Sequence, residues 1–455
     1  MSWVELHRGQ RALIVGLAKS GEAAAYLLKR RGLEVIVNDR RERLNPDYEA
    51  EKLEAAGIQT VFGGHPVSLL DDRPDFIVKN PGVPYRVPLI AEAMQRGIPV
   101  YTEIEVASWL THAPIYAITG SNGKTTTTTL VGEMLAEAKQ DPVVAGNIGL
   151  VLSGVVEQVR PDQPIVLEVS SFQLMGTESF HPKIAALLNL YPAHLDYHET
   201  FEAYVDAKWR LFQNLGEHDT AVLNYDQPLI RERAATLTTP VVWFSRSTEV
   251  SEGVFVRGSE VVVRRQGVDT PVIRLSAIAM KGEHNLENAL AATAIAVWAG
   301  APLSAAAYVL TRFRGIEHRL EFVRTVEGAD YYNDSKATNP EAALRALRSF
   351  EKNVVWIAGG LDRGDDFRVM LEDLRTRVRA AYLIGQSAER LAAVCQEAGV
   401  PHVEQVPSLE QAVVQAHRTA APGDVILLSP ACASWDMFAS FEVRGRMFKD
   451  IVHTL

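Results

Sequence analysis

Short apolar runs alternate with stretches of helical spacing along the first hundred residues. Apolar runs cover residues 12–16, 33–37, 75–78 and 98–101, and residues 21–31 carry helical spacing between the first two runs. Apolar runs of this length predict buried strands, and their alternation with helices predicts a mostly parallel sheet. The first segment is therefore expected to form an α/β domain.

Two further segments repeat this alternation. The second contains apolar runs over residues 115–118, 165–169 and 184–188, an alternating segment over 254–274 and an alanine-rich helical stretch over 285–299. The third contains apolar runs over residues 354–358, 381–384 and 425–428. The alternating segment turns at a Gly-Ser pair, which predicts antiparallel strands at a sheet edge. We predict three α/β domains, residues 1–102, 103–315 and 316–455.

The bulk composition fits this organisation and excludes some functions. The chain has 455 residues, a length typical of about three domains, and a formal net charge of −10. This charge argues against a protein that binds nucleic acid through a general positive field. Its two cysteines, Cys395 and Cys432, lie in no ligand-spaced cluster, so neither a disulfide framework nor a zinc site is expected. No secretory signal and no run of about 18 apolar residues occurs, so we expect a cytoplasmic protein without membrane insertion.

A glycine-rich loop joins a predicted strand to a predicted helix in the second domain. Residues 119–126 read Thr-Gly-Ser-Asn-Gly-Lys-Thr-Thr. Glycines let several backbone N–H groups point at one anion, and a helix N-terminus adds partial positive charge. Lys124 would reach nucleotide phosphates, and the Thr125 hydroxyl would bind Mg²⁺. Ile118 replaces the first glycine of the full phosphate-loop pattern, so only its second half is present.

Five consecutive threonines, residues 125–129, open the helix after this loop. Threonine is β-branched and has a low helix propensity, so the run breaks a local rule. Such a departure is typical of a functional site. We also expect some of residues 126–129 to pack against or cap the first helical turn.

Three polar side chains are candidates for a metal site. Glu168 lies at the end of a predicted strand, where an open α/β sheet places ligand groups, and Mg²⁺ prefers such oxygen ligands. His194 follows the next predicted strand and could bind a second metal ion, although a single histidine is more often structural. Lys208 lies in a helix predicted over residues 201–214, and from the sequence alone it is a solvated lysine.

Four sequence stretches carry a resemblance to a known family. They are residues 120–126 (Gly-Ser-Asn-Gly-Lys-Thr-Thr), 168–174 (Glu-Val-Ser-Ser-Phe-Gln-Leu), 334–340 (Asp-Ser-Lys-Ala-Thr-Asn-Pro) and 429–434 (Ser-Pro-Ala-Cys-Ala-Ser). Through these motifs essentially the whole chain resembles the Mur ligases, the ATP-dependent ligases that build the stem peptide of peptidoglycan. The phosphate loop is shared by the superfamily, which includes folylpolyglutamate synthase, and the other stretches are more specific.

The resemblance implies a fold and a reaction. The fold is a Rossmann-like N-terminal domain for the UDP-substrate (1–102), a central P-loop-type ATPase domain with a mostly parallel sheet (103–315) and a Rossmann-like C-terminal domain for the amino acid (316–455). The reaction is the ligation of D-glutamate to UDP-N-acetylmuramoyl-L-alanine through an acyl phosphate. Both partners are small molecules, and we expect a monomer that binds no nucleic acid.

The resemblance also implies which residues bind ATP and two Mg²⁺ ions. ATP contacts are expected at Gly120, Ser121, Asn122, Gly123, Lys124, Thr125, Thr126, Asn285, Asn288, Arg319, Asp334 and Lys336. Metal ligands are expected at Thr125, Glu168, His194 and Lys208, with Lys208 carbamylated so that its ammonium becomes an anion. Catalytic roles are expected for Lys124, Asn147, His194, Lys208 and Arg319.

The same resemblance implies the residues that bind the substrates. They are Lys19, Ser20, Asp39, Arg40, Arg41, Asn80, Gly82, Asn147, Ser170, Lys336, Thr338, Arg363, Ser434 and Phe441. The UDP end is expected to contact Lys19, Ser20, Asp39, Arg40 and Arg41, whereas D-glutamate is expected to contact Ser434 and Phe441.

Two positions depart from the family pattern. Ala193 lies where some relatives have an acid before the histidine, so a contact to the incoming amine is in doubt. Arg363 lies where some relatives have a lysine that holds the glutamate side chain. Arginine can bind a carboxylate in a bidentate manner, but its geometry differs from that of lysine.

Three other functions remain open from the sequence. Another ligase of the superfamily would share the ATP chemistry and differ in the terminal domains. A nucleotide-dependent switch would need only the glycine-rich loop. A dinucleotide-dependent oxidoreductase is suggested by residues 15–21, Val-Gly-Leu-Ala-Lys-Ser-Gly, followed by Asp39, although this stretch lacks the full set of glycines.

Overall fold

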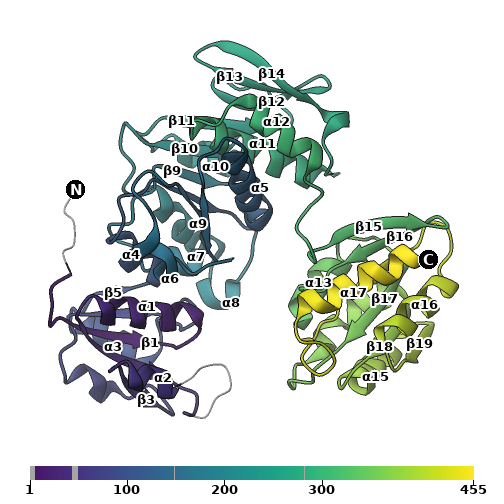
Figure 1. Ribbon diagram of the computed structural model, residues 1–455, viewed down its shortest axis with the longest axis horizontal. Helices are drawn as coiled ribbons and strands as arrows, with labels where there is room; N and C mark the ends of the chain where they lie inside the picture. The colour runs from purple at the N-terminus through teal and green to yellow at the C-terminus, as the bar shows by residue number, and fades with distance from the viewer. Residues whose placement is uncertain (1–5, 44–49, 148, 281) are drawn as a thin grey trace. The chain divides into compact units, whose positions relative to one another are not determined.

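The computed structural model describes residues 6–43, 50–147, 149–280 and 282–455 (Figure 1). Its internal contacts divide the chain into two compact units, Met1–Phe313 and Arg314–Leu455. The first unit holds two separate sheets and the second holds one. The further division of the first unit near residue 102 stays a prediction.

The first sheet has five parallel strands in the order β3-β2-β1-β4-β5. Its strands are β1 (Arg11–Val15), β2 (Glu34–Asp39), β3 (Gln59–Phe62), β4 (Phe76–Lys79) and β5 (Val100–Tyr101). Its helices are α1 (Lys19–Arg30), α2 (Ala50–Ala55), η1 (Val67–Leu70) and α3 (Pro88–Gln95). Chain order reverses between β1 and β4, so the loops after these strands lie beside each other, where open α/β sheets bind ligands.

The second sheet has nine strands in the order β14-β13-β12-β11-β10-β9-β6-β8-β7. Its strands are β6 (Ile115–Thr119), β7 (Val143–Gly146), β8 (Ile165–Glu168), β9 (Ile184–Leu187), β10 (Thr220–Asn224), β11 (Val241–Ser245), β12 (Gly253–Arg257), β13 (Glu260–Arg265) and β14 (Val268–Arg274). Strands β12 to β14 pair antiparallel and the others pair parallel, which confirms the antiparallel segment predicted over 254–274.

Helices flank this second sheet. They are α4 (Glu103–Ser108), α5 (Lys124–Glu137), α6 (Leu152–Val155), η2 (Val156–Gln158), α7 (Ser171–Leu174), α8 (Leu195–His198), α9 (Phe201–Trp209), η3 (Arg210–Phe212), α10 (Pro228–Ala234), η4 (Leu275–Ala277), α11 (Glu283–Trp298) and α12 (Leu303–Arg312). The helix predicted over 201–214 is shorter than expected, because α9 passes into a 3₁₀ turn after Trp209. Helices α5 and α11 pack on each other.

A buried carboxylate holds in place the segment that follows the last strand of the first sheet. Glu105 on α4 is fully buried and accepts hydrogen bonds from the Trp109 indole, the Ser179 hydroxyl and the backbone amides of Glu178, Ser179 and Phe180. Just before α4, Thr102 donates from its amide to Gly176 O and from its hydroxyl to Gln173 O. These bonds tie residues 102–105 to the segment that follows β8.

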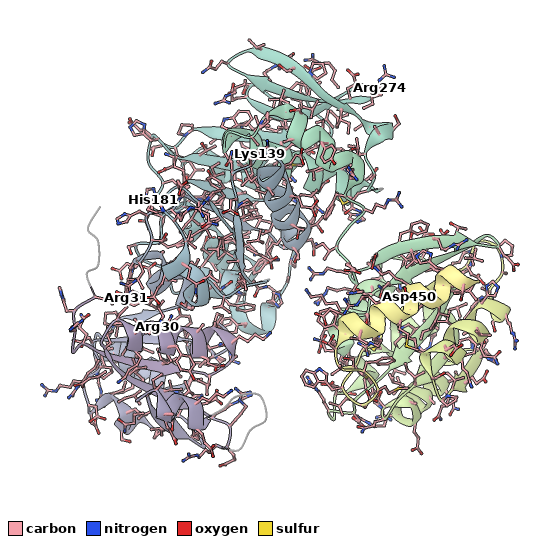
Figure 2. All side chains as sticks on the ribbon, in the orientation of Figure 1. Arg30, Arg31, Lys139, His181, Arg274 and Asp450 are labelled. Carbon is pink, nitrogen blue, oxygen red and sulfur yellow. The ribbon has the colours of Figure 1, made fainter. Side chains whose placement is uncertain are left out.

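Charged residues at the end of α1 also reach the second sheet's helices. Arg30 and Arg31 form ion pairs with Glu157 at N–O distances of 2.7 and 3.0 Å. Figure 2 shows both arginines at the end of α1. Helix α1 packs on α4 and α6, so the two sheets of the first unit share a contact surface.

The second unit is a doubly wound sheet of six strands in the order β15-β16-β20-β17-β18-β19. Its strands are β15 (Glu321–Val326), β16 (Ala329–Asn333), β17 (Val354–Gly359), β18 (Val378–Ile384), β19 (His402–Gln405) and β20 (Val425–Leu428). Its helices are α13 (Pro340–Leu347), η5 (Phe367–Met370), α14 (Leu371–Arg377), α15 (Ala388–Ala398), α16 (Leu409–Thr419) and α17 (Phe441–Thr454). Only β15 and β16 pair antiparallel.

A buried arginine joins the loops at the carboxyl end of this sheet. Arg444 on α17 is fully buried and donates to the carbonyls of Ser335, Gly359 and Cys432 and to the Ser335 hydroxyl. These acceptors lie after β16, β17 and β20. Burial lowers the pKa of Arg444 to about 10. One side chain therefore fixes three loops that meet where the chain order reverses.

The two cysteines are both buried and unbridged. No helix within the described parts of the chain is long and apolar enough to cross a membrane.

Replacing Glu105 with alanine is expected to lower the free energy of unfolding by about 3 kcal/mol. The substitution leaves several buried donors without an acceptor, and each such donor costs about 1–3 kcal/mol. Urea unfolding followed by fluorescence measures the change. Glu34→Ala is the matched control, because the Glu34 side chain is 62% exposed in its ion pair with Arg11. Equal stability of Glu105→Ala and Glu34→Ala would contradict this account of α4.

Candidate active site

The glycine-rich loop joins β6 to α5, as predicted. Gly123 precedes the helix with a φ of 80°, a left-handed conformation that glycine adopts without strain. A Cβ at this position would come within 2.1 Å of Asn288 Oδ1 on α11. Asn288 is buried, so α11 supplies the wall against which the loop packs. Asn288 therefore lies at the loop, and Asn285 lies one turn earlier on α11, whereas their predicted contact with ATP stays a prediction.

The segment after β9 holds the first half of the loop. Ser121 N donates to Asn189 O at 2.9 Å, and Asn122 N donates to Asn189 Oδ1 at 2.8 Å. The Ser121 hydroxyl lies 2.9 Å from Tyr204 Oη on α9. These amides are used in holding the loop. The anion-binding amides are therefore expected at Gly123 and in the first turn of α5, where the partial positive charge of the helix lies.

The ammonium of Lys124 lies over the loop. Its Nζ donates to Gly120 O at 2.8 Å and to Ser121 O at 3.0 Å. Both acceptors are loop carbonyls, so the positive charge sits where a phosphate would approach the loop.

The threonine run is largely a packing feature. Thr127 and Thr128 are fully buried, and the Thr127 hydroxyl lies 3.4 Å from Asn288 Oδ1. The Thr129 hydroxyl donates to Thr125 O one turn earlier. Thr125 and Thr126 occupy the first turn of α5, next to the loop. The expectation that some of these threonines pack or cap is confirmed.

Lys208 is not a solvated lysine. Its side chain is 1% exposed, and Nζ donates to Gly120 O at 2.9 Å and to the Thr119 hydroxyl at 3.3 Å. Nζ also lies 4.8 Å from the centre of the Tyr204 ring. Burial lowers the pKa of Lys208 well below 10.5, and the charge of Lys124 lowers it further, whereas Glu168 opposes the shift. The structure thus brings Lys208 to the back of the phosphate loop.

Glu168 ends β8 beside the loop and is 1% exposed. Its Oε1 accepts a hydrogen bond from Asn147 Nδ2 at 3.1 Å, whereas its buried Oε2 has no hydrogen-bond partner among the residues that the structure describes. An unpartnered buried carboxylate oxygen is costly, and a cation would satisfy it. This oxygen fits a hard metal ion such as Mg²⁺. No cluster of three or more His, Cys, Asp or Glu occurs in the part of the chain that the structure describes, so other ligands must complete a metal site.

His194 lies on an exposed turn that leads into α8. It has a φ of 54°, and its ring packs edge-on against Phe172, with the ring centres 5.0 Å apart. Phe172 follows Ser170, which caps α7 through a reciprocal pair of bonds with Gln173. The Ser-Ser-Phe-Gln stretch therefore has a structural role, because it forms a capping box and supports the His194 turn.

The predicted UDP-binding residues lie at the reversal point of the first sheet. Asn80, just after β4, donates to the Ser20 hydroxyl at 2.8 Å and accepts from Gly82 N at 3.0 Å. Asp39 accepts from Leu17 N at 2.7 Å and binds Arg41 at 3.0 Å. Arg40 and Lys19 are exposed beside them. The Asp39 carboxylate thus holds the loop after β1.

In the second unit, predicted residues gather at the ends of β16 and β20. Asp334 is buried and accepts from the Ser429 hydroxyl at 2.8 Å and from Leu320 N at 3.1 Å. Burial raises the pKa of Asp334 to about 6. The exposed Arg319 precedes Leu320, and its charge opposes this shift. The Lys336 ammonium lies 5.8 Å from the Phe441 ring centre.

The remaining amino-acid-site candidates lie on neighbouring loops of this unit. Ser434 is buried after β20, and Thr338 lies before α13 with its amide donating to Lys336 O. The Arg363 guanidinium stacks over the Trp435 ring at 4.6 Å. Since Trp435 is 61% exposed, this stack presents Arg363 at the surface next to Ser434.

Sequence reasoning missed several residues that shape these sites. Tyr204 lies one helical turn before Lys208, so the two side chains share a helix face. This spacing could have indicated in the sequence that Tyr204 lies beside Lys208. Asn189 and Arg444 gave no such signal, because their roles depend on contacts between distant segments. Lys79 is a lysine at the end of an apolar strand, a break in pattern that could have been noticed.

Family models match three successive parts of the chain. They are a Mur ligase MurD-like N-terminal domain over residues 10–102, a Mur ligase middle domain over 118–296 and a Mur ligase glutamate ligase domain over 318–432. The α/β fold class is confirmed, and the chain belongs to the Mur ligase family.

Within this family, the similar relatives carry one name. The UDP-N-acetylmuramoylalanine–D-glutamate ligase of Geobacillus kaustophilus is 47% identical, with 100% of each chain covered. The ligase of the same name from Bacillus subtilis is 46% identical, with 98% of each chain covered.

Solved structures agree at the level of the fold. UDP-N-acetylmuramate-alanine ligase MurC from Thermotoga maritima has a TM-score of 0.51 at 19% identity, covering 98% of this chain and 99% of that one. MurF ligase from Thermotoga maritima in complex with ADP has a TM-score of 0.51 at 16% identity, covering 98% of this chain and 96% of that one.

The depressed pKa of Lys208 predicts a pH-dependent stability. Between the lowered folded pKa and 10.5 the unfolded state binds more protons at this site, so the folded state gains stability as pH rises. The unfolding free energy of the wild type should rise relative to Lys208→Met, with a slope of up to about 1.4 kcal/mol per pH unit. Urea unfolding in CO₂-free buffer between about pH 7.5 and 9.5 measures the difference. Parallel curves for the two proteins would refute a depressed pKa.

Proposed function

We propose that this chain catalyses the ATP-dependent ligation of D-glutamate to UDP-N-acetylmuramoyl-L-alanine. The observation that carries the proposal is the full-length similarity, at 47% identity, to a relative named for this reaction. The groups at the glycine-rich loop also support it. Lys124 is an amine held against the loop, Lys208 is a buried amine that contacts the loop, and Glu168 is a buried carboxylate beside it, so together they would form a phosphate site. A neighbour of the same fold in complex with ADP supports an adenine nucleotide as a ligand.

The chemistry begins by making a carboxylate electrophilic. A carboxylate oxygen of the UDP-substrate attacks the γ-phosphorus of ATP, the bond to the β–γ bridging oxygen breaks, and an acyl phosphate and ADP form. Lys124 and, from the second unit, Arg319 would stabilise the charge of this transfer. The amine of D-glutamate then attacks the acyl carbon, phosphate leaves, and the amine loses a proton to give the amide.

Glu168 and Thr125 would hold one Mg²⁺ ion. The support is the buried Glu168 Oε2, for which the described parts of the chain supply no hydrogen-bond partner. A Mg²⁺ ion at this position would neutralise phosphate charge during the transfer. Asn147 would keep the carboxylate oriented through its bond to Oε1 and would contact the substrate near the reacting group.

Lys208 would carry a carbamate and, with His194, would support a second Mg²⁺ ion. Only a neutral amine can attack CO₂, because an ammonium has no lone pair. The attack forms an N–C bond and releases a proton, which leaves an anionic group on Nζ. Burial of Lys208 beside Lys124 favours the neutral amine. The same surroundings then favour the anion, because it would pair with Lys124 and with the metal.

The second unit would hold D-glutamate, and the first sheet would hold the UDP end. Ser434, Phe441, Lys336 and Thr338 would bind the amino acid, and Arg363 would bind a carboxylate in a bidentate manner. Asp334 and Lys336 would approach the nucleotide. Lys19, Ser20, Asp39, Arg40, Arg41, Asn80, Gly82 and Ser170 would contact the UDP-substrate. A monomer in the cytoplasm remains our prediction.

Phosphate release should depend on one amino acid. With ATP, Mg²⁺ and UDP-N-acetylmuramoyl-L-alanine, release is expected with D-glutamate and not with L-glutamate or meso-diaminopimelate, accompanied by a product of matching mass. Release with another amino acid would keep the ligase chemistry and overturn the roles given to Ser434, Phe441 and Arg363. Release without any amino acid would favour a nucleotide switch.

Lys208→Ala should reduce activity by at least about 100-fold, because it removes both the buried amine and the proposed carbamate. Formate or bicarbonate should partly restore activity, since a small carboxylate can occupy the vacated space. The control is Lys139→Ala, which replaces an exposed lysine beyond the end of α5, labelled in Figure 2. Full activity in Lys208→Ala would exclude the carbamate.

A further inference from the structure

A second lysine is buried in the first unit, away from the phosphate loop. Lys79 ends β4 and is 0% exposed. Its Nζ lies 4.5 Å from the centre of the Tyr85 ring. Burial lowers its pKa to about 7. Burying an amine costs free energy that its hydrogen bonds must offset, so the groups that it contacts indicate its role.

The amine of Lys79 closes the turn that follows β4. Nζ donates to Val83 O at 2.8 Å and to Asn80 O at 3.2 Å, with Pro81 O at 3.4 Å. The turn itself is closed by Val83 N, which donates to Asn80 O at 2.9 Å. One amine therefore binds three carbonyls of the turn that carries Asn80 and Gly82.

The same amine reaches the second sheet's side of the unit. Nζ lies 3.3 Å from Tyr197 Oη on α8, and this hydroxyl is also 3.3 Å from Val83 O. The Tyr197 ring packs edge-on against Phe172, with the centres 4.7 Å apart. Phe172 in turn packs against His194. A continuous chain of contacts runs from the turn after β4 to the His194 turn.

Within the described part of the chain, the hydrogen-bond partners of Nζ are three carbonyls and a phenol. An ion pair would stabilise the lysine locally, whereas carbonyl contacts instead order the backbone that supplies them. Asn80 benefits directly, because its side chain bridges Ser20 and Gly82 only if the turn keeps its shape. Lys79 thus orders two residues proposed to bind the UDP-substrate without being exposed itself.

We propose that Lys79 is a positioning residue that locks the Asn80–Val83 turn and joins it, through Tyr197, to the aromatic contacts around His194. Lys79 acts through Asn80 and Gly82 and does not touch the substrate. The inference rests on the proposed function, because it assumes that this turn binds the UDP end. It assigns Lys79 to substrate affinity and leaves the chemical step to the phosphate-loop residues.

The test compares Lys79→Met with Tyr197→Phe in the full chain. Methionine keeps most of the buried length and removes the donor, and phenylalanine keeps the ring on Phe172 and removes Oη. Lys79→Met should raise the KM for UDP-N-acetylmuramoyl-L-alanine about tenfold, with kcat and the KM for ATP within about twofold of wild type. Tyr197→Phe should raise the same KM about threefold, and the double variant should resemble Lys79→Met, because the hydroxyl acts through Nζ.

The controls separate this inference from the proposed function. UDP binding by calorimetry needs no turnover, and Lys79→Met should weaken it about tenfold. A wild type that is inactive with every amino acid would refute the proposed function. Equal UDP affinity in wild type and Lys79→Met would refute the role of Lys79. A rise in the KM values for all three substrates together with a fall in kcat would also refute it, because such a uniform change indicates general misfolding. If Lys79→Met fails to fold, an unchanged KM in Tyr197→Phe overturns the proposal.

Discussion

The buried amine of Lys208 against the Gly120 carbonyl is the contact on which the phosphate site depends. It joins α9 to the loop after β6, and the Lys124 ammonium donates to the same carbonyl. Two amines on one carbonyl repel each other, and this repulsion is tolerable only because burial lets one amine be neutral. The loop therefore has a definite shape and one side chain prepared to become an anion.

Parallel sheets explain why the remaining candidates gather where they do. All strands of the first sheet present their carboxyl ends at one edge, and chain order reverses there between β1 and β4. Asn80 and Ser20 meet at this reversal, and Gly16 permits it, because a Cβ there would lie 2.7 Å from Asn80 Cβ. In the second unit the reversal lies between β17 and β20, where the loops fixed by Arg444 meet. Each site follows from strand order, and side chains adjust its details.

The sequence predicted this architecture well, and its limits were physical. Buried central strands such as β6, β9 and β20 have uninterrupted apolar runs, and their bounds were predicted to within a residue. Edge strands such as β3 and β19 are partly exposed and carry mixed residues, so their pattern resembles a loop and they were not predicted. Glu168 and the loop followed from local rules. The burial of Lys208 did not follow from local rules, because apolar residues flank it in the sequence of α9. Only tertiary packing shows which face of this helix is covered.

Three buried basic side chains then acquire a common explanation. Lys79, Lys208 and Arg444 are each at most 1% exposed, and among the residues that the structure describes their hydrogen bonds go to carbonyls or hydroxyls. A carboxylate partner would bind each basic group directly, but burying such an ion pair also costs desolvation free energy. Carbonyl partners instead fix the backbone to which they belong. This backbone lies at the ends of β4, β6, β16, β17 and β20. Each of these side chains therefore orders a loop that carries candidate binding residues, and the burial of its polar end is the energetic cost of holding that loop in one shape.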